Sequence, residues 1–223
     1  MVLKITGLAS AICTQRVLTL LHEKDITDFE IIPISLADMK GPAYLKLHPF
    51  GKIPVLDDDG YILYESRAIC KYLAKKYAGQ GTKLLPADED LKGYGLFEKA
   101  CSLESSYFNH PASEIADLKL FKPAYGAGQP DEVVVAKQVA DLEKVLIVYD
   151  GILATQQYLA GDELTLADLF HLSYGTVVKD LGYSDIFDKL PNVKRWFDSL
   201  QERESWKKVP STVKFIEGLS GKH

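Results

Sequence analysis

The sequence predicts a two-domain chain, with an α/β domain in residues 1–80 and a domain built only of helices in residues 91–223. The first is predicted because short β-rich runs alternate with helical stretches up to about residue 77. The second is predicted because later apolar residues repeat at three and four positions. Residues 79–90 contain two glycines and a proline without periodicity, so the linker is placed at 81–90.

The order of elements in the first domain predicts its fold. Residues 2–6 alternate apolar and polar side chains and stop at Gly7, which is typical of a short strand that ends in a turn. The full set expected is a strand at 2–6, a helix at about 14–24, a strand at 29–34, a hairpin of 53–56 and 61–64 around the turn 57–60, and a helix at 66–77. This β-α-β, loop, β-β-α order is the arrangement of the thioredoxin-like fold.

The helical domain is predicted most clearly where apolar residues recur at steps of four and three. They are Val135, Val139, Leu142, Leu146, Tyr149 and Leu153. This period predicts one buried stripe, in preference to a face that binds a cofactor. Further along, Thr165 and Asp168 fit an N-terminal cap, which we favour over a catalytic role for the acid. Pro191 opens a last major helix, whose Trp196 and Phe197 are expected in the core.

Composition narrows the functional classes. The net charge is −5, from 26 Lys and Arg against 31 Asp and Glu, and no basic stripe follows the chain, so nucleic acid is not an expected partner. No apolar run approaches the roughly 18 residues that span a bilayer, so no membrane association is expected. Three cysteines lack C-x-x-C or Cys/His ligand spacing, so neither disulfides nor a metal site is expected. We expect a cytoplasmic protein with reduced thiols.

Two short segments carry the candidate chemistry, and the first is Ile53-Pro54 at the head of a strand. Proline cannot donate to a sheet ladder, so it must lie at an edge or beside an unusual feature. If the bond is cis, the Ile53 amide and carbonyl face an open edge, where an extended peptide can add like a further strand. The alternative is an ordinary edge-strand proline.

The second segment is Glu65-Ser66-Arg67, where a strand gives way to a helix. Unpaired first-turn amides and the positive helix end favour a bound carboxylate there, and Ser66 can donate as well. The alternative is that Ser66 is only an N-cap. Both segments flank one groove of the inferred fold, together with the cations Lys40 and Lys52. Such a groove suits a short, acidic, extended peptide.

The residues Pro49–Pro54 and Glu65–Ile69 match paired signatures of glutathione transferases, and the sequence resembles the phi class in particular. The similarity covers nearly the whole chain, including residues 158–162 and 166–169. The resemblance implies that the peptide is glutathione, bound as a co-substrate without a metal. It further implies that Ile53 pairs its backbone with the cysteinyl part, with Pro54 cis.

The resemblance also assigns the ends of glutathione. Glu65 and Ser66, beside Arg67, would bind its γ-glutamyl end, and Lys40 falls where the family has a lysine near the glycine carboxylate. Two positions depart from the family pattern. Lys52 stands where a glutamine is commoner, and the family histidine before Lys40 is here Met39. The second departure weakens one contact without removing the site.

The resemblance also implies a homodimer, because Phe50 resembles the family's aromatic residue that inserts into the partner subunit. Its alternative is a local core residue. The hydrophobic acceptor is expected between the domains, over the first loop and the helix ending near residue 108. Its candidate wall consists of Tyr107, Phe108, Leu118 and Phe121, which are equally compatible with core positions.

The group that activates the glutathione thiol departs from the family. A thiol near pKa 8.5 is mostly protonated at neutral pH, so a transferase must stabilise the thiolate. The phi-class serine falls on Ala11 here, with Ser10 one residue earlier and Cys13 two residues later. The donor is then Ser10, Thr14 or the first amides of the helix, or conjugation is weak.

Cys13 offers another chemistry, because a cysteine near a helix N-terminus can form a mixed disulfide with glutathione. Its alternative is a small buried hydrophobe, and Cys70 and Cys101 are interpreted as packing residues. The favoured function is therefore conjugation of glutathione to hydrophobic electrophiles, as in detoxification. The alternatives are a ligandin that stores hydrophobic small molecules with weak turnover, a Cys13-dependent thiol transferase, and a scaffolding module without chemistry.

Overall fold

The fold is known from a computed structural model that describes residues 2–220 and divides into two compact units. The first unit contains the chain up to Lys83 together with the short segment Glu204–Pro210. The second contains Leu84–Arg203 and the chain from Ser211 onward. Residues 79–90 form neither helix nor strand. The return of Glu204–Pro210 to the first unit had no signal in the sequence, which placed it in the helical domain.

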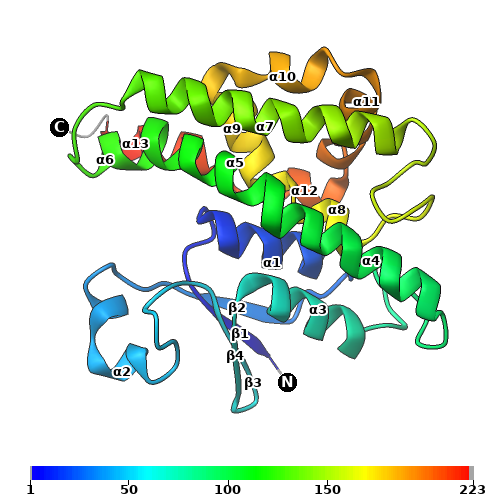
Figure 1. The fold of residues 1–223 in the computed structure, drawn as a ribbon. Helices are drawn as coiled ribbons and strands as arrows, with labels where there is room; N and C mark the ends of the chain where they lie inside the picture. Colours follow the sequence, from blue (N-terminus) through cyan, green and yellow to red (C-terminus); the bar gives the residue numbers. More distant parts are fainter. Residues whose placement is uncertain (1, 221–223) are drawn as a thin grey trace. The chain divides into compact units, whose positions relative to one another are not determined.

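The first unit is a four-stranded mixed sheet with helices, as the sequence predicted. Its strands are β1 (Leu3–Thr6), β2 (Phe29–Ile32), β3 (Val55–Asp58) and β4 (Tyr61–Tyr64). Its helices are α1 (Ile12–Glu23), η1 (Asp38–Lys40), α2 (Pro42–Leu45), α3 (Ser66–Lys76) and α12 (Glu204–Lys207). The sheet order is β2-β1-β3-β4, and only β1 and β2 run parallel. In Figure 1, α1 and α3 lie on the same side of the sheet, and they pack against each other.

The hairpin differs from the expectation by two residues. Strand β3 begins at Val55, and the turn consists of Asp59 and Gly60 alone, because Asp58 pairs with Tyr61. Both turn residues have positive φ, of 55° and 88°. Such a two-residue turn matches the twist of its strands, so the hairpin is tighter than the four-residue turn that was expected.

The second unit is helical throughout, which confirms the fold class. Its elements are α4 (Leu91–Leu103), η2 (Glu104–Phe108), α5 (Asn109–Ala116), η3 (Asp117–Phe121), α6 (Lys122–Ala124), α7 (Glu132–Leu153), α8 (Leu166–Leu169), α9 (Leu172–Val178), η4 (Lys179–Tyr183), α10 (Asp185–Asp188), α11 (Pro191–Gln201) and α13 (Thr212–Ser220). The elements η2, η3 and η4 are π-helical turns. Figure 1 shows α7 running alongside α5, which it contacts. Among the described helices, none is long and apolar enough to cross a membrane.

A buried carboxylate organises the core of this unit. Asp168 is fully buried and accepts from the Leu159 amide at 2.9 Å and the Trp196 indole at 3.0 Å through one oxygen. Its other oxygen accepts from the amide and hydroxyl of Thr165, each at 3.0 Å. Thr165 and Asp168 thus form a capping box at the start of α8, as predicted. One side chain thereby joins the loop before α8, the helix start and α11.

Candidate functional site

A stretch of backbone beyond the sheet ladder forms the first part of the site. The pairing of β1 with β3 ends at Thr6 and Val55, so Ile53 and Pro54 lie past the last paired residue. Within residues 2–220, the amide and carbonyl of Ile53 have no hydrogen-bond partner in the protein. The peptide bond between Ile53 and Pro54 is cis, as expected. The segment therefore offers an extended ligand one donor and one acceptor.

Two side chains hold the loop that carries this segment. Tyr44 Oη donates to the Lys52 carbonyl at 2.7 Å, and Lys40 Nζ donates to the Gly51 carbonyl at 3.2 Å. Burial raises the pKa of Tyr44 to about 12, so its hydroxyl keeps its proton and remains a donor. Gly51 has a φ of 57°, and an added Cβ would lie 2.6 Å from the Met39 carbonyl oxygen, so the bend requires glycine.

The start of α3 forms the facing part of the site. Its first helical hydrogen bond runs from the Ile69 amide to the Glu65 carbonyl at 2.9 Å, so the earlier amides of the helix have no helical acceptor. Ser66 is 5% exposed, and within the described chain its hydroxyl has no protein partner. Arg67 beside it is half-buried. Amides, hydroxyl and helix dipole together make this end a place for a carboxylate.

Glu65 has an unusual backbone conformation, with φ 72° and ψ 107°. Such a conformation costs a residue other than glycine on the order of 1–3 kcal/mol, and it is found most often at binding and catalytic sites. The side chain of Glu65 is exposed. A carboxylate therefore stands beside a helix end whose first amides have no helical acceptor.

The start of α1 lacks the expected hydroxyl. Ala11 is the N-cap residue, and no side chain caps the helix. Ser10 precedes it in a turn and is 7% exposed. Thr14 is fully buried, and its hydroxyl has no hydrogen-bond partner among residues 2–220. An added Cβ at Gly7 would lie 2.8 Å from that oxygen. The Thr14 hydroxyl therefore faces the interior against Gly7.

The three cysteines are free and differ in environment. Cys13 is half-exposed, and Arg16 Nη1 donates to its sulfur at 3.4 Å. It is therefore not the fully buried hydrophobe that was the alternative. Burial raises the pKa of Cys70 to about 12, so it stays a thiol, and Cys101 is also buried, as expected for packing residues. In the part of the chain that the structure describes, no group of three or more His, Cys, Asp or Glu could hold a metal ion.

The four candidate acceptor residues lie on the π-helical turns η2 and η3, but their exposure differs. Tyr107 is 59% exposed, whereas Phe108 is fully buried with its ring edge-on to His171 at 4.6 Å between centroids. Leu118 is 7% exposed, and Phe121 is half-buried. The expectation that Phe108 and Leu118 line a wall is therefore replaced by core packing within the helical unit. Tyr107 and Phe121 keep accessible surface.

Phe50 lies in the loop before β3 and is 67% exposed, so it is not a local core residue. The neighbouring His48 is 2% exposed, and its ring lies edge-on to Phe50 at 6.2 Å between centroids. The sequence pattern did not single out His48 or Tyr44. Both stand just ahead of the recognised Pro49–Pro54 motif, and only the folded loop reveals that they hold it.

Comparisons with known proteins identify the family. The Glutathione S-transferase, N-terminal domain family matches residues 12–76, and the Glutathione S-transferase, C-terminal domain family matches residues 106–204. The chain belongs to the glutathione S-transferase family. Its fold and its sequence motifs agree with this membership. The resemblance inferred from the Pro49–Pro54 and Glu65–Ile69 motifs is thereby confirmed.

Individual glutathione S-transferases resemble the chain over almost its whole length. Glutathione S-transferase hmp2 of Hypomyces subiculosus is 49% identical over 96% of this chain and 100% of that protein. The crystal structure of glutathione transferase F7 from Populus trichocarpa has a TM-score of 0.87 at 36% identity and covers 98% of this chain and 99% of its own. The F series of plant relatives supports the phi class. Glutathione S-transferase I from maize, solved with an atrazine glutathione conjugate, has a TM-score of 0.84 at 33% identity and covers 100% of this chain and 99% of its own.

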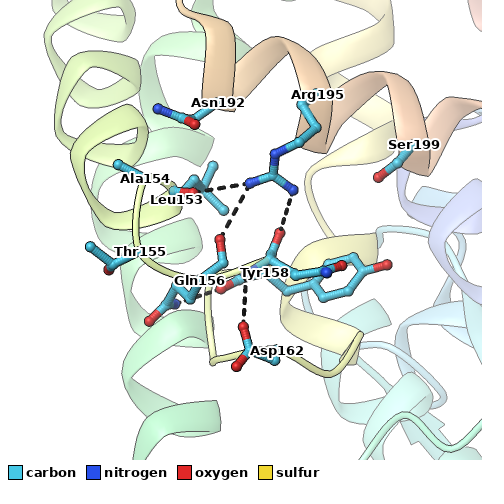
Figure 2. A pocket seen from close by; sticks show the side chains of 10 residues that line it. Leu153, Ala154, Thr155, Gln156, Tyr158, Asp162, Asn192, Arg195 and Ser199 are labelled. Atoms are coloured by element: carbon cyan, nitrogen blue, oxygen red, sulfur yellow. Dashed lines mark hydrogen bonds between the residues drawn. The ribbon is translucent and has the colours of Figure 1, made fainter.

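A separate pocket of about 500 Å³ in this glutathione S-transferase lies at the end of α7 and contains none of the predicted site residues. Figure 2 shows Arg195 at its centre, with the guanidinium turned toward backbone oxygens. Arg195 donates to the carbonyls of Leu153 at 3.0 Å and of Gln156 and Gln157 at 3.3 Å each. A guanidinium so placed satisfies carbonyls at a helix end, so we interpret this pocket as a structural joint.

Asp150 forms a second link between α7 and α11, and here the side chain comes from α7. This residue of α7 accepts from the amides of Asn192 at 2.8 Å and Val193 at 3.1 Å, which are first-turn amides of α11. Asp150 therefore caps the start of α11 while Arg195 of α11 caps the end of α7. Each helix supplies the partner that the other lacks.

Proposed function

We propose that this chain catalyses the conjugation of the glutathione thiol to hydrophobic electrophiles, as in detoxification. The observation that carries the proposal is the pairing of a free backbone edge at Ile53 with the amino end of α3, where the buried Ser66 hydroxyl has no protein partner. An extended peptide that ends in a carboxylate satisfies both groups. The atrazine glutathione conjugate of the maize relative supports the reaction class.

The proposed binding mode places each part of glutathione against a group with matching chemistry. The cysteinyl unit pairs its backbone with Ile53, ahead of Pro54. The γ-glutamyl carboxylate lies against Ser66 and the first amides of α3, near Arg67, and its ammonium group lies against Glu65. At the other end, the exposed ammonium groups of Lys52 and Lys40 neutralise the glycine carboxylate. The lysine at position 52 supplies a charge at this end of the site.

Isothermal titration with glutathione and turnover of a nitroaryl halide test the proposal together. We expect glutathione to bind at concentrations up to millimolar and the thioether product to form in its presence. Binding of a hydrophobic dye with no turnover would favour the ligandin alternative. Absence of glutathione binding at millimolar concentration would overturn the proposal, because no reaction of the thiol is possible without it.

Stabilisation of the thiolate is proposed to come from the first-turn amides of α1 with Ser10, because Ala11 carries no hydroxyl. Replacing Ala11 by serine adds a donor at the helix start. We expect kcat/KM for conjugation to rise at least about tenfold, since one aimed donor at a developing anion is worth that or more. Steady-state kinetics at fixed pH measures the change.

The matched control for Ala11→Ser is Cys13→Ser, which alters the same helical turn. We expect conjugation by Cys13→Ser to stay within about twofold of wild type, whereas reduction of a glutathione mixed disulfide would be lost if the thiol transferase alternative held. The half-exposed sulfur of Cys13 beside Arg16 is what keeps that alternative testable. An unchanged rate in Ala11→Ser would show that a missing hydroxyl does not limit conjugation.

We further propose that the chain forms a homodimer in which the exposed Phe50 ring of one copy enters a pocket on the other. A pocket of about 200 Å³ between α5 and α7 is lined by Tyr107, Pro111 and Val145 among others. Replacing Phe50 by alanine removes the ring, and we expect the dimer dissociation constant to rise by about 100-fold. Light scattering across a dilution series measures the dissociation constant, with Tyr125→Ala as a similarly exposed aromatic control. A dimer unaffected by Phe50→Ala contradicts the contact.

The proposed location is the cytosol. Free Cys13, Cys70 and Cys101 suit a reducing compartment, and no pair of them forms a disulfide. Glutathione, the proposed co-substrate, is a small charged peptide that the site would take from water. Fractionation of cells that express the tagged chain tests this, and recovery with membranes would contradict it.

A further inference from the structure

His48 occupies a buried position at the centre of the loop that precedes the glutathione site. It is 2% exposed, and its Nδ1 atom is buried without a hydrogen-bond partner in the described chain. A neutral imidazole leaves one ring nitrogen without a proton, and a buried nitrogen that makes no hydrogen bond is best left in that form. The site therefore favours the neutral ring with Nδ1 unprotonated.

The ring and backbone of His48 connect two segments of the site, which we call its arms. One arm is the loop that leads to Ile53, and the other is the end of β4 that leads to α3. Its ring lies over Tyr64, with centroids 4.5 Å apart and planes at 33°, and Tyr64 directly precedes Glu65. Its carbonyl accepts from the Gly51 amide at 2.8 Å, and its amide donates to the Tyr44 carbonyl at 2.9 Å. One residue thus contacts the arm that leads to Ile53 and the arm that leads to α3.

We propose that His48 is a positioning residue that holds the two arms of the glutathione site in register only while its imidazole is neutral. The proposal rests on the proposed function, because it concerns the same glutathione site. His48 does not touch the ligand in it. Its effect passes through Tyr64 to Glu65 on one arm and through Gly51 to Ile53 on the other.

The charges around His48 determine what protonation does. Burial lowers the pKa of His48 from its ordinary value of 6.5, and the ammonium groups of Lys52 and Lys40 lower it further. The Glu65 carboxylate and the backbone of His48 itself oppose this shift without reversing it. Tyr44, whose carbonyl accepts from the His48 amide, stays neutral because burial raises its pKa to about 12. An imidazolium would draw Glu65 toward itself and repel both lysines, so it would withdraw the charges proposed for the two ends of glutathione.

The lowered pKa of His48 determines the direction in which pH changes the stability of the packed loop. The unfolded or loosened chain binds a proton on this histidine more readily than the packed loop does, so the packed loop is favoured above about pH 6.5 and loses that advantage as the pH falls through the lowered pKa of His48. We therefore expect the KM for glutathione to rise by about fivefold between pH 7.5 and pH 5.5. The electrophile KM is not expected to follow it.

The decisive variant is His48→Phe, which keeps a ring against Tyr64 and carries no charge. We expect its KM for glutathione to stay flat across this pH range and its kcat at pH 7.5 to match wild type. His22→Phe is the matched control, because His22 also has a pKa lowered by burial but lies near the end of α1 beside Phe29. We expect that variant to retain the wild-type rise.

A second measurement keeps the inference testable if His48→Phe fails to fold. Binding linkage is reciprocal, so glutathione must lower the pKa of His48 if protonation weakens glutathione binding. Imidazole NMR titration of the wild-type protein, with and without saturating glutathione, measures this shift. An unshifted His48 titration, or identical KM profiles in wild type and a folded His48→Phe, overturns the inference. Wild type that binds no glutathione at pH 7.5 would overturn the proposed function instead.

Discussion

Replacing Asp168 by alanine is expected to lower the free energy of unfolding by about 3–5 kcal/mol. The reason is that four donors lose their acceptor in a fully buried place: the amides of Leu159 and Thr165, the Thr165 hydroxyl and the Trp196 indole. A loss of this size lowers the melting temperature of a chain this long by about 10 °C. Urea unfolding followed by circular dichroism measures the free energy directly.

Two comparisons make the Asp168 result specific. Asp168→Asn keeps one acceptor oxygen and should lose about half as much stability, because only one pair of donors is left without it. Asp162→Ala is the matched control, and it should stay within about 0.5 kcal/mol of wild type. Asp162 is exposed, and within the described residues its side chain accepts only from the Gln157 amide, at 3.1 Å. Equal losses in Asp168→Ala and Asp162→Ala would contradict the organising role of the buried carboxylate.

Replacing Ser66 by alanine is expected to weaken glutathione binding by about 10- to 100-fold, as loss of a hydrogen bond to a charged group costs roughly 1.5–3 kcal/mol. The helix itself loses no cap, because Glu65 is its N-cap residue and no side chain of the described protein caps it. Stability should therefore remain close to wild type while affinity falls. Isothermal titration gives the affinity, and thermal unfolding gives the stability.

The control for Ser66→Ala is Ser105→Ala. Ser105 is exposed, and in the part of the chain that the structure describes its hydroxyl donates only to the Ser102 carbonyl, at 3.3 Å. We expect glutathione affinity to be unchanged in it. If Ser66→Ala binds glutathione as tightly as wild type, the proposed position of the γ-glutamyl carboxylate at the start of α3 is wrong. Lost affinity together with lost stability would instead show that Ser66 supports the fold.

The spacing of apolar residues and the positions of glycine and proline predicted most of the fold. The predictions that were wrong have physical causes. The apolar stripe of α7 is buried except for Val139, which is half-buried, and Gln138 takes a buried place that hydrophobicity alone does not indicate. Phe108 was assigned to a wall because aromatic residues suit both cores and pockets. Residues 204–210 contact α1 through Gln15, which donates to the Pro210 carbonyl at 2.7 Å. A contact between residues so far apart in the chain leaves no local pattern.

The candidate site was predicted through its motifs, because Ile53-Pro54 and Glu65-Ser66 combine residue types whose backbone behaviour is distinctive. What the motifs did not reveal is how the loop between them is held. Tyr44 and His48 act through a carbonyl and a ring face, and neither contact has a sequence period. Thr14 was a candidate donor from its position alone, and its burial against Gly7 appears only when β1 and α1 are packed.

The mutual capping of α7 and α11 has a consequence for how the helical unit opens. Fraying of the last turn of α7 would take away the carbonyl acceptors of the Arg195 guanidinium. Fraying of the first turn of α11 would take away the amide donors of the Asp150 carboxylate. Since each loss exposes the groups that the other helix depends on, the two ends are coupled and should exchange their amide hydrogens as one cooperative element. Local breathing at this corner is thereby suppressed, and slow isotope exchange there reports on the unfolding of both helices at once.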